Sequence, residues 1–165
     1  MGLDIRVATS ILEITDKDRI VDGDYYLRVS HEHPEMERAS DIKEGYYDLT
    51  GESFSFRAGS YSGYNFFRNL LSEAILGVPA EMVWDGIEFY EKKPFFELIN
   101  FSDCEGCMGP EVSKKLFKDF EENKEKFYTF INKKFEFESQ YYTRVYDDFM
   151  TGYGMVGDEG VLIFS

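Results

Sequence analysis

One stretch of the chain, residues 57–68 (RAGSYSGYNFFR), gathers groups that bind anions and aromatic rings. Arg57 and Arg68 lie at its two ends, and guanidinium groups bind phosphate or carboxylate through two parallel hydrogen bonds. Gly59 and Gly63 let the backbone turn its N–H groups toward a ligand, just before a helix whose N-terminus carries partial positive charge. We therefore predict a binding segment in which arginines hold an anion, hydroxyl and amide groups orient it and tyrosines stack on it: Arg57, Ser60, Tyr61, Ser62, Tyr64, Asn65 and Arg68.

A second stretch, residues 97–116 (ELINFSDCEGCMGPEVSKKL), repeats this arrangement of a polar loop before a helix, with acids in place of arginines. If the two loops meet, its carboxylates accept hydrogen bonds from ribose hydroxyls or an amino group of the same ligand. The candidate residues here are Asn100, Ser102, Asp103 and Glu105. The alternative is that Ser62 or Asn65 only caps the helix and that each arginine pairs with a carboxylate, with no ligand present.

Metal and redox chemistry have weaker signals. Cys104 and Cys107 form a C-x-x-C and His31 and His33 form an H-x-H, which together would supply a Cys2His2 zinc set. The spacing is not that of a known zinc finger, and the βαβ context of a thioredoxin-like pair is missing. We expect two reduced, partly buried cysteines, no metal and no cofactor.

Catalytic motifs are equally sparse. The sequence contains no G-x-S-x-G elbow, no P-loop and no dinucleotide fingerprint, and its two histidines fall in one polar loop. Asp103 with Glu105 could recruit Mg²⁺, so a metal-assisted hydrolase is a third hypothesis. We name no catalytic residue, and we favour binding without turnover.

Length and charge limit the number of domains and the classes of partner that the protein can bind. The 165 residues fit a single globular domain, 1–165, and a 43% hydrophobic content with 18% aromatics predicts a ring-rich core. Acidic residues number 32 against 18 basic ones, a net charge of −14 that repels phosphate backbones and disfavours direct nucleic-acid binding. The same acidity suggests an alternative function, a protein–protein inhibitor or DNA mimic acting on a host protein.

The sequence also predicts where the protein acts. The opening MGLDIRVATSILEI lacks the pattern of a signal peptide, and no apolar stretch approaches the ~20 residues of a membrane span. We expect a cytoplasmic protein without membrane association. A homo-oligomer is compatible with so many aromatic residues, but no heptad pattern specifies one.

Strands are expected first along the chain. Alternating and β-branched residues predict strands over 3–14 and 22–30, followed by a surface loop over 31–45. Residues 45–60 suggest a hairpin with Thr50-Gly51 as its turn and Ser53 to Arg57 as the returning strand.

Helices are expected after residue 61. An apolar period begins at Tyr64 and ends at Gly77 and Pro79, and short helices are expected within 79–93 and 94–100. Residues 109–131 form the clearest helix, 139–150 form another closed by Thr151-Gly152, and 160–165 form a final strand. The predicted fold class is α+β, with an N-terminal, mostly antiparallel sheet that the C-terminal strand rejoins, packed against several helices.

Four segments also carry a family resemblance: MGLDI, FRAGSYSGYNFFR, ELINFSDCEGCMGPEVSKKLFKDF and the closing strand. In the same order, they are similar to a family of small proteins of bacteriophages and bacterial genomes that has no assigned activity. The resemblance implies a phage or prophage context, in a host bacterial cytoplasm, and no catalytic role. With the two loops, it leads to our first hypothesis: a soluble phage-type protein whose pocket binds a small anionic, nucleotide-like ligand, acting as a counter-defence sponge for a signalling nucleotide.

Overall fold

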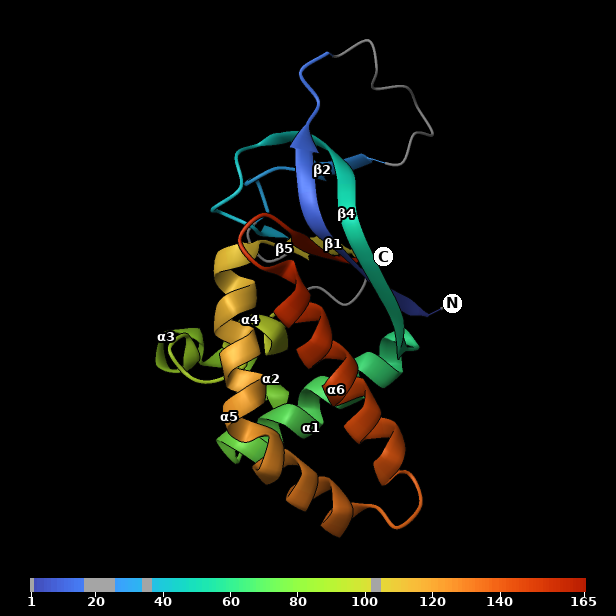
Figure 1. Ribbon diagram of the computed structural model, residues 1–165. Helices are drawn as coiled ribbons and strands as arrows, with labels where there is room; N and C mark the ends of the chain where they lie inside the picture. Colours follow the sequence, from blue (N-terminus) through green and yellow to red (C-terminus); the bar gives the residue numbers. More distant parts are fainter. Residues whose placement is uncertain (1, 17–25, 34–36, 102–104) are drawn as a thin grey trace.

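A computed structural model describes residues 2–16, 26–33, 37–101 and 105–165. A curled sheet lies above a group of helices, which confirms the predicted α+β class (Figure 1). The strands are β1 (Leu3–Glu13), β2 (Tyr26–Val29), β3 (Glu37–Arg38), β4 (Gly45–Gly59), β5 (Gly106–Met108) and β6 (Val161–Phe164). The helices are α1 (Tyr61–Leu76), α2 (Ala80–Asp85), α3 (Ile87–Tyr90), α4 (Phe96–Ile99), α5 (Pro110–Lys134) and α6 (Ser139–Val156).

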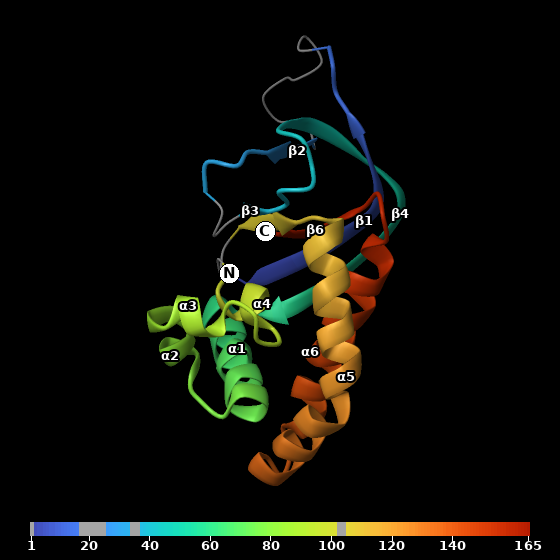
Figure 2. The same cartoon turned by 90° about the vertical axis from the view of Figure 1, so that its left-hand side faces the viewer.

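The sheet has the strand order β2-β4-β1-β6-β5-β3. The pairs are antiparallel except for β3 with β5, which is parallel. The C-terminal strand β6 rejoins the sheet, as the sequence predicts, and lies beside β1. The sheet curls strongly, so that β2 at one end lies above β3 and β5 at the other (Figure 2).

The face of the sheet that meets the helices carries the main core. Along β1, Leu3, Ile5 and Val7 are fully buried, while the alternate residues Asp4 and Arg6 are exposed on the opposite face. The long helices α5 and α6 pack against each other and α6 packs on β1, with α1 beside α5 (Figures 1 and 2). Ring contacts centred on Phe149, in α6, join this helix to β4, α1 and α5.

A smaller core fills the inside of the curl, on the face away from the helices. It contains Ala8, Leu27, Val29, Ala39, Ile42, Tyr47, Cys107 and Val161. This cluster joins the two ends of the sheet, because Leu27 and Val29 come from β2 while Cys107 comes from β5.

The hairpin predicted at Thr50-Gly51 is wrong. The chain runs straight through as one strand, β4, which pairs with β1 from Tyr47 to Gly59. Gly51 has a φ of 75°, and the register shifts opposite it, between Ala8 and Ser10. A positive-φ glycine therefore marks an irregularity within a long strand here, because the partner strand continues on both sides of it.

Other boundaries also differ from the sequence prediction. α6 continues through Thr151-Gly152 to Val156, since Gly152 lies against Val7 and Leu162 where the helix meets the sheet. The 31–45 segment contains the short strand β3, and the second polar stretch contains β5. By contrast, α1 ends at Gly77 with a left-handed backbone and α5 begins at Pro110, both as predicted.

Within the described ranges, no helix combines the length and the apolar character that crossing a membrane requires.

Candidate functional site

Arg68 lies inside the protein. Its side chain is 5% exposed, and its guanidinium donates hydrogen bonds to the carbonyls of Ile99, at 3.3 Å, and of Phe101. It also donates to Oδ1 of Asn65 and lies over the rings of Tyr64 and Trp84, at 4.9 and 5.5 Å. These contacts make Arg68 a link between α1 and the end of α4 and leave it little capacity for an outside ligand.

The neighbours of Arg68 in the first stretch also contact the protein itself. Ser60 is the N-cap of α1, where its hydroxyl accepts from the Gly63 N–H at 3.0 Å, and it lies 3.1 Å from the hydroxyl of Ser62. Tyr61 is half-buried at the edge of the main core, and Tyr64 is fully buried within it. Of the predicted set, only Arg57, Ser60 and Ser62 have well-exposed side chains in this stretch.

The two predicted loops do approach each other, through backbone rather than through acids. Arg68 of the first stretch holds the Ile99 and Phe101 carbonyls of the second, and Arg38 donates to the Asn100 carbonyl at 3.0 Å. Ser102 and Asp103 lie outside the described residues. Glu105 is described and is exposed, just before β5.

Arg57 and Glu105 belong to the same open face of the sheet. The register places Arg57 beside Asp4, and Arg6 beside Ser55 on one side and Ile163 on the other. These side chains alternate with the residues that pack against the helices, so they share the opposite face. The face runs from Arg57 on β4, across β1 and β6, to β5.

A first cavity on this face, of about 380 Å³, is lined mainly by polar side chains. Its charged groups are Asp4, Arg6 and Arg57, with Ser55 directly opposite Arg6. Arg57 is diagonal to Arg6 across β1 and β4, a relation that separates two residues by about 7–8 Å, within reach of long side chains. In the structure the Arg57 guanidinium lies against Gly2, two residues before Asp4. Asp4 lies 3.5 Å from Arg57, and both side chains are about 60% exposed.

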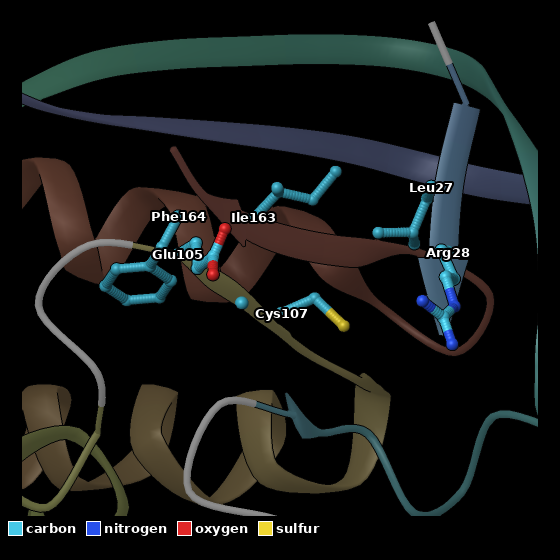
Figure 3. Close-up of a pocket in the computed structure, with 7 residues that line it drawn as sticks. Leu27, Arg28, Glu105, Cys107, Ile163 and Phe164 are labelled. Carbon is cyan, nitrogen blue, oxygen red and sulfur yellow. The ribbon is translucent and has the colours of Figure 1, made fainter. Parts of the chain in front are cut away.

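A second cavity, of about 280 Å³, lies where the curled sheet brings β2 over β5 and β6 (Figure 3). Arg28 stands on the β2 side, and Glu105, Cys107 and Ile163 stand on the other (Figure 3). Leu27 points toward Cys107 and Ile163, which gives the cavity an apolar floor. The two cavities are neighbours, because β6 borders this one through residues 163–164 and the next residue, Ser165, borders the first.

The arginines that line these two cavities differ in their pairing. Within the described part of the chain, Arg57 pairs with Asp4, whereas the guanidinium groups of Arg6 and Arg28 make no hydrogen bond or ion pair. Other exposed cations of the described residues, such as Lys92 and Arg144, also lack a carboxylate partner, so position and not pairing alone distinguishes Arg6 and Arg28. Both line a cavity, where a ligand anion could supply the missing partner.

Arg6 and Arg28 are the functional candidates that sequence reasoning missed. The signal for Arg6 was the alternation of Asp4 and Arg6 with apolar neighbours in β1, which predicts an exposed face. No local signal pairs Arg6 with Arg57, because their meeting depends on the register of strands about fifty residues apart in sequence.

The residues proposed for zinc do not gather in the described structure. Cys107 is buried, and Cys104 lies outside the described residues. His31 uses its Nε2 to donate to the Ile42 carbonyl at 2.9 Å. Over residues 2–16, 26–33, 37–101 and 105–165, no group of three or more His, Cys, Asp or Glu side chains is placed to hold a metal ion.

Comparison with protein families, with curated proteins and with solved structures finds no match for this chain. The resemblance to phage proteins drawn from the sequence therefore stays a prediction.

Proposed function

We propose that this protein binds a small anionic ligand of the phosphate class on the open face of its sheet, and holds it without turnover. The observation that carries the proposal is the pair of arginines, Arg6 and Arg28, that line adjoining cavities without a carboxylate partner. A guanidinium group presents several N–H donors in a plane, which suits the oxygens of a phosphate.

The first cavity offers the better anion site. Arg6 and Arg57 line it from two adjacent strands, and Ser55 supplies a hydroxyl directly opposite Arg6. Asp4 pairs with Arg57 across 3.5 Å in an exposed position, and such a pair is weak enough for a ligand anion to displace it. An incoming phosphate would therefore contact two cations that rigid strands position.

The second cavity suits the neutral part of the same ligand. Leu27, Cys107 and Ile163 form apolar surface, and Glu105 offers a carboxylate that accepts hydrogen bonds from hydroxyl or amino groups. A nucleotide has both parts: an anionic phosphate for the first cavity, and a sugar and base with polar and apolar surface for the second. In the phage setting predicted from the sequence, such a protein would sequester a signalling nucleotide.

The proposal moves the anion site away from the pair Arg57 and Arg68. Arg57 remains in it, and Arg68 is replaced by Arg6, because the guanidinium of Arg68 is buried and already bonded to backbone carbonyls. Glu105 keeps the role first given to it, as an acceptor for hydroxyl or amino groups.

The test begins with the small molecules released when the purified protein is heat-denatured, identified by mass spectrometry. A thermal-shift screen with inorganic phosphate, mononucleotides and cyclic dinucleotides follows. We expect an intact nucleotide to be released or to raise the melting temperature, and Arg6→Gln and Arg57→Gln each to abolish that rise.

The matched control is Arg144→Gln, which neutralises an exposed arginine on α6, outside this face. This variant should respond to the ligand as the wild type does. Release of no ligand together with no stabilisation by any of these anions would overturn the proposal. So would an equal loss in the Arg144→Gln variant, because net charge and not the cavity would then explain the effect.

A further inference from the structure

The two short helices α2 and α3 expose apolar side chains to an unusual degree. Met82, Trp84, Ile87 and Phe89 are 50, 41, 46 and 69% exposed, and they fall within eight consecutive positions. We call these four side chains the α2–α3 patch. The helices project from the side of the protein, away from the open face of the sheet (Figure 2). Several large exposed apolar side chains this close together in the chain are typical of an interaction surface.

The α2 part of the patch is held in place from beneath. The indole Nε1 of Trp84 donates to the Ile99 carbonyl at 2.9 Å, and the Arg68 guanidinium lies 5.5 Å from the centre of its ring. Val83, between the exposed residues, is fully buried in the main core. Because Trp84 and Val83 anchor α2, a partner that binds there would lose little free energy to ordering of the backbone.

The charges that surround the patch indicate the chemistry of its partner. Glu81, Asp85, Glu88 and Glu91 alternate with the apolar residues, and all four are exposed. None of these four carboxylates forms an ion pair within the described ranges. Lys92 and Lys93 are the only basic residues of the segment 80–93, so its local charge remains negative.

We propose that the α2–α3 patch docks a basic partner protein, through a surface on which apolar side chains are bordered by lysines and arginines. Tryptophan and other aromatic residues dominate the binding energy of such interfaces, and oppositely charged rims set orientation and association rate. A second copy of this chain fits poorly, since two surfaces of the same sign would meet in a protein of net charge −14. This inference is independent of the anion site and locates the interaction that the acidic composition suggests.

The chain carries its own probe for the test, because Trp84 is its single tryptophan and lies within the patch. The probe ligand is a synthetic amphipathic peptide of leucine and lysine, compared with a leucine and glutamate peptide of the same pattern. We expect the lysine peptide to move Trp84 emission to shorter wavelength and the glutamate peptide to leave it unchanged. Affinity for the lysine peptide should fall as salt rises.

Matched variants separate the patch from the rest of the surface. Met82→Ser combined with Phe89→Ser should weaken binding of the lysine peptide at least about tenfold, as expected for central apolar contacts. Phe137→Ser removes an even more exposed aromatic side chain, at 86%, from the turn between α5 and α6 and should bind as wild type. Glu88→Gln with Glu91→Gln should weaken binding, while Glu136→Gln with Glu138→Gln should not.

Three results would overturn the inference. One is equal affinity of the patch variants and the Phe137→Ser control. Another is binding of the glutamate peptide as strongly as the lysine peptide. The third comes from sedimentation of the protein alone: a wild-type dimer that Met82→Ser with Phe89→Ser converts to monomer would show that a second copy occupies the patch.

Discussion

The Arg68 guanidinium, in the middle of α1, donates a hydrogen bond to the main-chain carbonyl of Phe101, two residues after the end of α4. The same group reaches the Ile99 carbonyl, and both carbonyls belong to buried residues. Arg68 therefore satisfies the polar backbone where α4 ends, a task that a helix C-terminus usually leaves to a glycine or to water.

Arg68→Ala should accordingly be strongly destabilising. It leaves the Phe101 carbonyl without its donor, takes one of two donors from the Ile99 carbonyl, which keeps the Trp84 indole N–H, and removes the group beneath the Trp84 ring. We expect the free energy of unfolding to fall by about 3 kcal/mol, a typical effect of breaking a buried charged network. Urea denaturation followed by circular dichroism measures it.

Arg57→Ala is the matched control for that prediction. Arg57 is 59% exposed and pairs only with the equally exposed Asp4 in the described structure, so we expect a change within about 0.5 kcal/mol. A loss in Arg57→Ala as large as that in Arg68→Ala would show that the two arginines do not differ in the way their burial indicates.

Two glycines with the same backbone angle should respond differently to alanine. Gly51 and Gly77 both have a φ of 75°, but a Cβ at Gly51 would lie 2.4 Å from Oγ1 of Thr9, whereas one at Gly77 would meet nothing within 4 Å. Gly77→Ala should cost about 1 kcal/mol of stability from strain alone, and Gly51→Ala more. Thermal unfolding of both variants measures this, and equal losses would contradict the clash with Thr9.

Asp119, in α5, predicts a pH dependence of stability. It is nearly fully buried, accepts from the Phe95 N–H at 2.9 Å and lies 2.9 Å from the Lys115 ammonium. Burial raises its pKa above the ordinary 3.8, an effect larger than the opposing ones of the Phe95 N–H and Lys115. The Asp119 carboxyl group therefore binds its proton more tightly in the folded state than in the unfolded state.

The sign of that dependence follows from linkage. The stabilisation of the folded state that comes from protonated Asp119 is fully present below pH 3.8. It is lost as the pH rises through the folded-state pKa of Asp119. Asp119→Asn does not titrate, so the stability of the wild type relative to this variant should fall over that pH range. Urea unfolding of both proteins from pH 3 upward measures the difference, and a difference that grows with pH would contradict the raised pKa.

If Arg6 and Arg57 hold the same anion, their effects on binding should be coupled. In a double-mutant cycle with Arg6→Gln and Arg57→Gln, we expect the combined loss of ligand affinity to differ from the sum of the single losses by at least about 0.5 kcal/mol. Isothermal titration with the ligand found by the thermal-shift screen provides the affinities. Strictly additive losses would place the two arginines in separate sites.

The sequence by itself determined the class of each major element. Regular apolar spacing predicted α1 and α5. Gly77 marked the end of α1 and Pro110 the start of α5, because helix boundaries depend on the backbone preferences of single residues. The alternation in β1 and the apolar C-terminal strand were sufficient to predict the α+β class. The same local rules failed at Gly51, since a glycine with positive φ serves a turn and a strand irregularity equally well.

Only the tertiary structure decided which polar residues are available to a ligand. Arg57 and Arg68 look equivalent in the sequence, yet strand alternation turns Arg57 outward, while Arg68 follows Tyr64 by four positions on the buried side of α1. The pairing of Arg6 with Ser55, and so its place near Arg57, depends on the register of β1 with β4. Register is set by the fit of whole strands and of the core beneath them, and no short motif encodes it.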